Sequence, residues 1–260
     1  MKPTSPRAAR RLAQKQTRAG ALSISDLADR VAKARLKGMS DVIETRAKRI
    51  LTSYLQTAQN YGMPVKNVLG EMASGQAAWR LGHAVRDELL KTPPDVVRKA
   101  ACKQGCAFCC ILSGGEGGVI TGFEAAQLHA ALTPLTGQPN GRDWHPEACA
   151  ALDPATQECR VYEARPMICR SFVSMDADAC EANANGGAEQ GAGLLGSHLD
   201  YLAIHALCRQ ALKGIAQVHS YSMADVSKGA VNGSDSFTSA RHGPSALERA
   251  CKDGARAAGV

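Results

Sequence analysis

Four cysteines within nine residues constrain this chain more than any other feature of its sequence. Buried free cysteines behave as small hydrophobic residues, but the polar Lys103 and Gln104 among these thiols argue against an apolar element. A loop that turns back on itself can direct three or four such thiols to a common centre. The sequence therefore predicts a metal site on this cluster, which consists of Cys102, Cys106, Cys109 and Cys110.

A second set of cysteines offers ligands from a distant part of the chain. Cys149, Cys159 and Cys169 are evenly spaced, with nine residues between neighbours. A closed site of four thiolates, whether tetrahedral zinc or an iron–sulfur cluster, needs ligands of this kind. We therefore expect both sets to contribute to the metal site.

The expected compartment also favours metal over disulfides. The first 20 residues are basic and lack the apolar stretch of a secretory signal. The chain contains no run of roughly 18 apolar residues, which a membrane-spanning helix requires. Clustered thiols in a reducing compartment are more typical of metal ligands than of disulfides. We expect a soluble cytoplasmic protein with no membrane contact.

The positive charge is concentrated at the start of the chain. The net charge is +7, and residues 1–50 hold 13 Lys or Arg against 4 Asp or Glu. Residues 1–22 show no sustained apolar face, so they are expected to form a flexible basic arm. Such an arm is either a solvated tail or a contact for nucleic acid or an acidic protein partner.

The periodicity of apolar residues predicts an α-rich α+β fold. Helices are expected from Ile24 to Leu36, from Asp41 to about Ala58, from Ser74 to Lys91 and from Ser197 to Ala216. Thr121 and Glu124 form a capping box that predicts another helix start. The expected division is a helical region at 23–95, a loop-rich cysteine domain with a closing helix at 96–216, and a mostly disordered tail at 217–260.

A longer motif includes Cys159 and Cys169, the last two cysteines of the second set. It reads Cys159-Arg-Val-Tyr-Glu-x-Arg-Pro-x-x-Cys169-Arg. Together with the four-cysteine cluster, it resembles the bacterial YkgJ-like cysteine-cluster family, a zinc- or iron-chelating domain, over about residues 100–180. The resemblance implies a further cysteine ligand. Cys180 is the expected residue, and Cys208 is the alternative.

Positive side chains near the thiols are expected to assist the metal. Four thiolates leave a formal charge of about −2 around zinc or an oxidised [4Fe–4S] core. Arg165 and Arg170 flank Cys169 and are expected to lower thiol pKa values and donate hydrogen bonds to sulfur. Tyr162, within the same motif, is expected to lie beside them.

The sequence leaves the metal and its role open. Adjacent thiols at Cys109 and Cys110 are awkward for one tetrahedral ion, which favours an iron–sulfur cluster, possibly [4Fe–4S], over zinc. The leading interpretation is a metal-binding protein with a redox or metal-handling role. One alternative is a cluster-dependent protein-modifying enzyme, either a methylase or of the radical S-adenosylmethionine type. Another is a zinc-stabilised nucleic-acid-binding module. No catalytic residue is assigned, and the sequence does not decide whether the protein is an enzyme.

Overall fold

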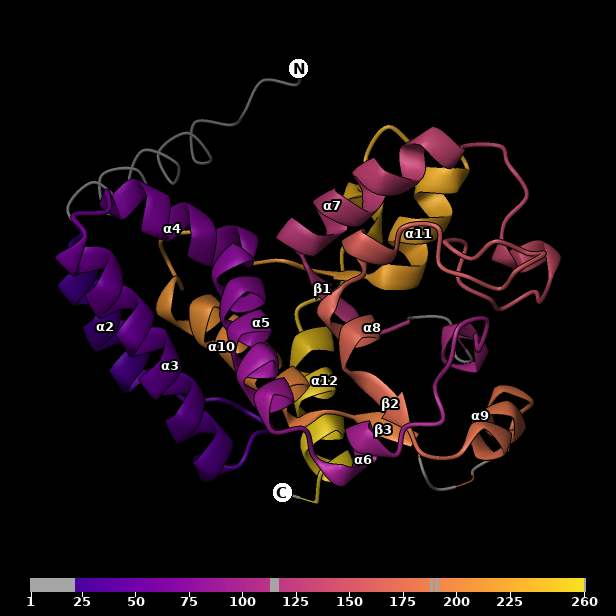
Figure 1. Ribbon diagram of the computed structural model, residues 1–260. Helices are drawn as coiled ribbons and strands as arrows, with labels where there is room; N and C mark the ends of the chain where they lie inside the picture. The colour runs from indigo at the N-terminus through magenta and orange to yellow at the C-terminus, as the bar shows by residue number, and fades with distance from the viewer. Residues whose placement is uncertain (1–21, 113–116, 188, 190–191, 260) are drawn as a thin grey trace.

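The computed structural model describes residues 22–112, 117–187, 189 and 192–259, and α-helices dominate them (Figure 1). The first helices are α2 (Ile24–Lys33), α3 (Asp41–Asn60), α4 (Val65–Ser74), α5 (Gln76–Lys91) and α6 (Asp95–Arg98). The later helices are α7 (Gly122–Leu132), α8 (Met167–Ser171), α9 (Ala177–Ala184), α10 (Gly196–Ala211), α11 (Met223–Val231) and α12 (Ala246–Ala257). The 3-10 turns are η1 (Phe108–Cys110), η2 (Thr133–Leu135), η3 (Gly141–Asp143), η4 (Tyr162–Ala164) and η5 (Thr238–Ala240).

Two small antiparallel sheets complete the described fold. β1 (Val119–Thr121) pairs with β4 (Ser220–Ser222), and β2 (Phe172–Ser174) pairs with β3 (Ala192–Leu194). Helices with only these two-stranded sheets confirm the expected α-rich α+β class.

The N-terminal helices form where the periodicity predicts them. Ser23 begins α2 with a capping box, and the helix ends at Lys33, three residues earlier than expected. α3 and α5 match the expected segments closely, while α4 was not predicted. The expected basic arm lies, apart from its last residue, outside the described residues.

Helix α10 occupies the centre of the larger core. It packs against α2, α3, α4, α5, α8 and α12, so it is buried on nearly every side (Figure 1). Residues such as Leu27, Leu51, Val68, Ala78 and Ile204 fill this core and have no exposed surface. The helix that was expected to close the cysteine domain therefore packs within the N-terminal helical region.

A smaller core lies between α7 and α11, beside the β1–β4 pair. Ile120, Ala125, Leu128, Val226 and Ala230 pack there, and α7 lies against α11 (Figure 1). The predicted capping box is confirmed. The Thr121 hydroxyl accepts from the Glu124 N–H, and the Glu124 carboxylate accepts from the Thr121 N–H.

The segment expected to be a mostly disordered tail is folded. Within residues 217–259, β4, α11, η5 and α12 form, and Met223, Val231, Leu247 and Cys251 are buried. The Gly/Ser content suggested disorder, but small residues permit close packing of α11 and α12 against neighbouring helices.

No helix in the described part of the chain has both the length and the apolar character needed to cross a bilayer.

Candidate metal centre

The first four cysteines lie on a reversing loop, the thiol knuckle (residues 102–110). Gly105 has φ +77°, a left-handed conformation that glycine adopts without strain, and the Cys106 N–H closes the turn on the Lys103 carbonyl at 3.0 Å. The loop then tightens into η1, where the Cys110 N–H donates to the carbonyl three residues earlier at 2.8 Å. The knuckle thus folds back on itself, as its spacing suggested.

Backbone pairing places the distal cysteines beside the knuckle. The Cys149 N–H donates to the Cys110 carbonyl at 2.8 Å, and the residues adjoining this pair form an antiparallel bridge. The chain then turns back, so that Cys159 forms a second bridge with Leu152. Three cysteines that are distant in sequence therefore lie on neighbouring segments.

The side chains of four cysteines enter one apolar cluster, and we call these residues the inner group. Cys149 is buried in the smaller core, and the other three are half-buried against it. Cys169 comes from α8, and its Sγ lies 3.3 Å from Met223 Sδ on α11. The members of the inner group are Cys110, Cys149, Cys159 and Cys169.

Three further cysteines are not part of the inner group, and we call Cys102, Cys106 and Cys180 the outer group. Cys102 Sγ donates to the Ser174 carbonyl at 3.7 Å, and α9, which carries Cys180, packs against η1. Burial raises the pKa of Cys106, and the charges of Cys109, Cys102 and Cys180 raise it further. These three neighbours therefore lie within electrostatic reach of Cys106.

Cys109 stands between the two groups. A hydrogen bond from the Cys110 thiol lowers the pKa of Cys109, and the Arg165 guanidinium lowers it as well. The Cys109 charge also raises the pKa of Cys106 in the outer group and of Cys169 in the inner group. Seven of the eight candidate ligands thus fall into the inner or the outer group, and Cys109 interacts electrostatically with members of both.

Burial keeps the inner thiols protonated in the absence of metal. It is the main cause that raises the pKa of Cys149, Cys159 and Cys169. Neighbouring thiolates raise the pKa of Cys169 further, because like charges in one apolar site oppose each other's ionisation.

The arginines of the motif act on the thiols through their charge, while the hydrogen bonds described for them go to backbone carbonyls and not, as expected, to sulfur. The charges of Arg165, Arg160 and Arg170 each lower the pKa of Cys159 and so oppose the effect of burial. The Arg165 guanidinium lies 3.4 Å from the centroid of the half-exposed Tyr162 ring. Arg170 donates to the Arg165 carbonyl at 2.8 Å, which ties the arginines to one another.

The arrangement gathers suitable ligands without forming a closed shell. Within the described ranges, no three Cys, His, Asp or Glu side chains are placed so that they hold an ion as they stand. In chemistry and number the donors fit zinc or an iron–sulfur centre, since both take four thiolates. The inner group holds four thiols in one apolar cluster, with cationic side chains beside it.

The helix that covers the inner group was not predicted from the sequence. Met223 on α11 contacts Cys169, and a hydrogen bond from Ser227 on the same helix lowers the pKa of Cys149. This helix lies in the segment expected to be disordered. One signal was present, because Ser222 caps α11 by accepting from the Asp225 N–H at 3.1 Å.

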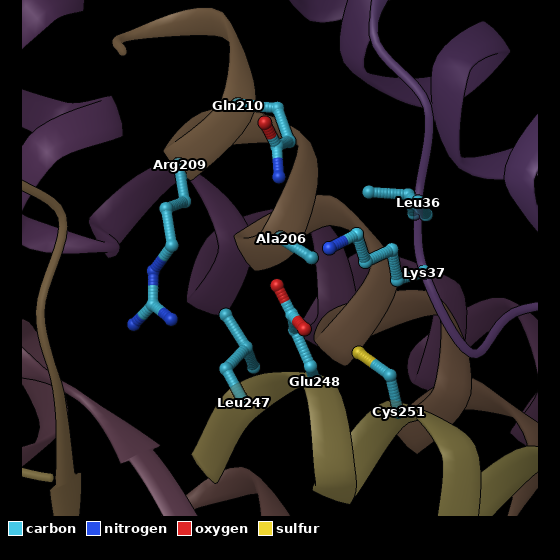
Figure 2. A pocket seen from close by; sticks show the side chains of 8 residues that line it. All are labelled: Leu36, Lys37, Ala206, Arg209, Gln210, Leu247, Glu248 and Cys251. Atoms are coloured by element: carbon cyan, nitrogen blue, oxygen red, sulfur yellow. The ribbon is translucent and has the colours of Figure 1, made fainter. Parts of the chain in front are cut away.

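Two pockets of the described fold lie away from the eight candidate ligands. One, of about 20 Å³, lies between α10, α12 and the segment after α2, with Lys37, Arg209 and Glu248 around it (Figure 2). It has room for about one water molecule. A wider and shallower hollow of about 470 Å³ lies on α3, beside Val42 and Arg49. None of the eight candidate ligands lines either pocket.

Comparison with known proteins identifies the cysteine-bearing segment. Residues 101–189, about a third of the chain, match the family model CxxCxxCC, described as "Putative zinc- or iron-chelating domain". No curated protein and no solved structure matches the chain. The match contains all eight candidate ligands and the three motif arginines. Residues 101–189 are therefore similar to the zinc- or iron-chelating domains of the CxxCxxCC family, and this similarity supports metal binding by the cysteine-bearing segment.

Proposed function

We propose that this protein holds two metal centres, each on four thiolates, and that these centres are iron–sulfur clusters or, as the alternative, zinc ions. The observation that carries the proposal is the inner group, in which four cysteines from three distant segments pack into one apolar cluster. Cysteines packed only as hydrophobes have no reason to converge in this way.

Two centres account for the adjacent thiols better than one. Neighbouring residues on a tight turn direct their side chains differently, so Cys109 and Cys110 serve separate centres. Cys110 completes the inner group, and Cys109 joins Cys102, Cys106 and Cys180 as the fourth outer ligand. Eight thiols then supply two complete shells.

The residues around the thiols prepare them for metal. The raised pKa values mean that binding releases protons from the inner group. Arg165 and Arg170 offset the negative charge that the thiolates then carry. Because the thiols do not form closed shells as they stand, binding also draws them closer together.

The biological role follows from the centre that is bound. An iron–sulfur cluster supplies one-electron transfer, whereas zinc in a closed four-thiolate shell stabilises the fold. An iron–sulfur cluster therefore supports a redox role, whereas zinc supports metal handling or stabilisation of the fold.

No observation favours the two alternative functions. The described residues form only two-stranded antiparallel sheets, whereas a radical S-adenosylmethionine enzyme requires a barrel of parallel strands. The basic arm that suggested nucleic-acid binding lies outside the described residues, except for residue 22.

Anaerobic purification followed by elemental analysis and an optical spectrum tests the proposal. We expect either a brown protein with broad visible absorption or a colourless one with about two zinc ions per chain. Cys149→Ala and Cys106→Ala should each remove about half of the metal. The matched control is Cys208→Ala, because Cys208 is fully buried in the larger core and belongs to neither group.

Three results would overturn the proposal. A folded wild-type protein without metal would reject metal binding. Loss of all metal in both the Cys149→Ala and the Cys106→Ala proteins would indicate a single centre. Equal loss in the Cys208→Ala control would show that metal retention reports only on stability.

A further inference from the structure

Helix α8 is too short to be stable alone, and it carries one ligand of the inner group. It has five residues, whereas an isolated helix needs roughly 12 to 15 to be even marginally stable in water. The position of Cys169 therefore depends on contacts that hold α8 from outside.

A buried carboxylate holds the first residue of this helix. Glu124 Oε1 accepts a hydrogen bond from the Met167 N–H at 2.7 Å, and both residues are almost fully buried. The other carboxylate oxygen accepts from the Thr121 N–H at 2.9 Å and from the Thr121 hydroxyl at 2.8 Å. The two oxygens thus serve different elements, because Oε2 completes the capping box of α7 and Oε1 reaches α8.

The helical core supplies two more contacts to this arrangement. The Tyr201 hydroxyl of α10 donates to Glu124 Oε2. Arg86 Nε of α5 donates to the Arg170 carbonyl at 2.9 Å, near the end of α8. Both Tyr201 and Arg86 lie outside the segment that matches the chelating-domain family.

Burying a carboxyl group is energetically costly unless hydrogen bonds satisfy its oxygens. Within the described residues Glu124 forms no ion pair, and a buried carboxylate is stable only when hydrogen bonds satisfy it. A capping box by itself uses one oxygen and is usually found at the surface, as Asp26 is in α2.

We infer that Glu124 is a positioning residue for the inner thiol group, which holds α8, and with it Cys169, against the helical core through Met167 and Tyr201. The inference rests on the proposed function for its biological meaning. Its structural content is independent of metal, since the contacts involve only protein atoms.

Alkylation of Cys169 in the metal-free protein tests this inference. The rate of iodoacetamide labelling is measured at each cysteine by peptide mass spectrometry, and Cys169 is compared with Cys102 in the same molecule. Glu124→Gln should raise the relative rate at Cys169 roughly tenfold, because an amide cannot accept from all the donors and α8 opens more often. Tyr201→Phe removes one donor and should raise it roughly threefold.

Asp26→Asn is the matched control. It also removes the acid of a capping box, but Asp26 accepts only from Ser23 at the start of α2. The relative rate at Cys169 should stay at the wild-type value. An unchanged rate in both Glu124→Gln and Tyr201→Phe would overturn the inference, as would an equal rise in Asp26→Asn. If Glu124→Gln does not fold, as judged by far-ultraviolet circular dichroism, Tyr201→Phe decides the question.

Metal loading of the same variants separates this inference from the proposed function. If wild-type protein binds zinc, Glu124→Gln should weaken its affinity for the inner centre roughly tenfold while Asp26→Asn leaves it unchanged. If wild-type protein binds no metal, the proposed function fails, but the alkylation rates still report whether Glu124 positions Cys169.

Discussion

Acid should destabilise this protein through a buried histidine in its central helix. His205 on α10 has no exposed surface, and its burial, aided by the charge of Arg209, lowers its pKa to about 3. In the unfolded chain a histidine has a pKa of about 6.5. Between these two values the unfolded state binds more protons than the folded state, so stability rises with pH.

The size of the effect follows from the two pKa values. Stability from the neutral His205 ring is fully present above about pH 6.5 and falls as the pH drops towards 3. Because pH 5 is still well above the folded-state pKa, the loss between pH 7 and pH 5 depends almost entirely on the unfolded-state value. It amounts to about 2 kcal/mol. Burial lowers the pKa of His198 to about 4, so protonation of His198 should lower the free energy of unfolding by a similar amount over the same pH range.

Urea unfolding at pH 7 and pH 5 measures this loss in the wild-type protein and in His205→Leu. The difference between the two pH values should be about 2 kcal/mol smaller in the variant, because only one titrating group has been removed. Acid release of metal affects both proteins and cancels in the comparison.

Leu207→Ala is the matched control for His205→Leu. Leu207 is also fully buried on α10, so its truncation should lower stability by about 3 kcal/mol at both pH values without changing the pH dependence. If His205→Leu keeps the wild-type pH dependence, the His205 ring is not the group that resists protonation in the folded protein, and this prediction is wrong.

Two further substitutions test the packing around the thiols and α10. Gly141→Ala should lower the metal content measured by elemental analysis, because a Cβ at this position would lie 2.3 Å from the Cys149 carbonyl oxygen. Gly243→Ala is the control and should leave the metal content unchanged, because no atom lies within 4 Å of a Cβ added there. Arg46 Nε lies 2.6 Å from the buried Asp200 carboxylate, and Arg46→Ala removes this partner. The substitution should lower the free energy of unfolding, measured with urea at pH 7, by about 2 kcal/mol. Wild-type stability in the variant would contradict this prediction.

Local patterns predicted the elements that are stabilised locally. The N-terminal helices and the capping box at Thr121 depend on contacts within one or two turns, so the sequence shows them directly. The approach of the two cysteine sets could also be expected, because thiols that share a metal must meet. The division into an inner and an outer group could not, since it depends on the backbone pairing of Cys149 with Cys110.

The central helix illustrates why burial was harder to predict than helicity. Leu199, Leu202 and Ala211 are buried as the apolar pattern of the helix suggests, but so are His198 and Asp200 on other sides of α10. Polar residues ordinarily mark a solvent-exposed face. Here neighbouring helices surround α10 and cover these polar side chains. Burial therefore lowers the pKa of His198 and raises the pKa of Asp200.

Contacts that join the two cores lie beyond any local pattern. The same Glu124 that the sequence shows as a capping residue also binds Met167, 43 residues later, and Tyr201, 77 residues later. A motif can reveal which residue caps a helix, because that partner lies three positions away. It cannot reveal the second use of the same carboxylate, which exists only once α8 and α10 have packed against α7. The position of Cys169 therefore depends on a part of the chain, α10, that the chelating-domain match does not cover.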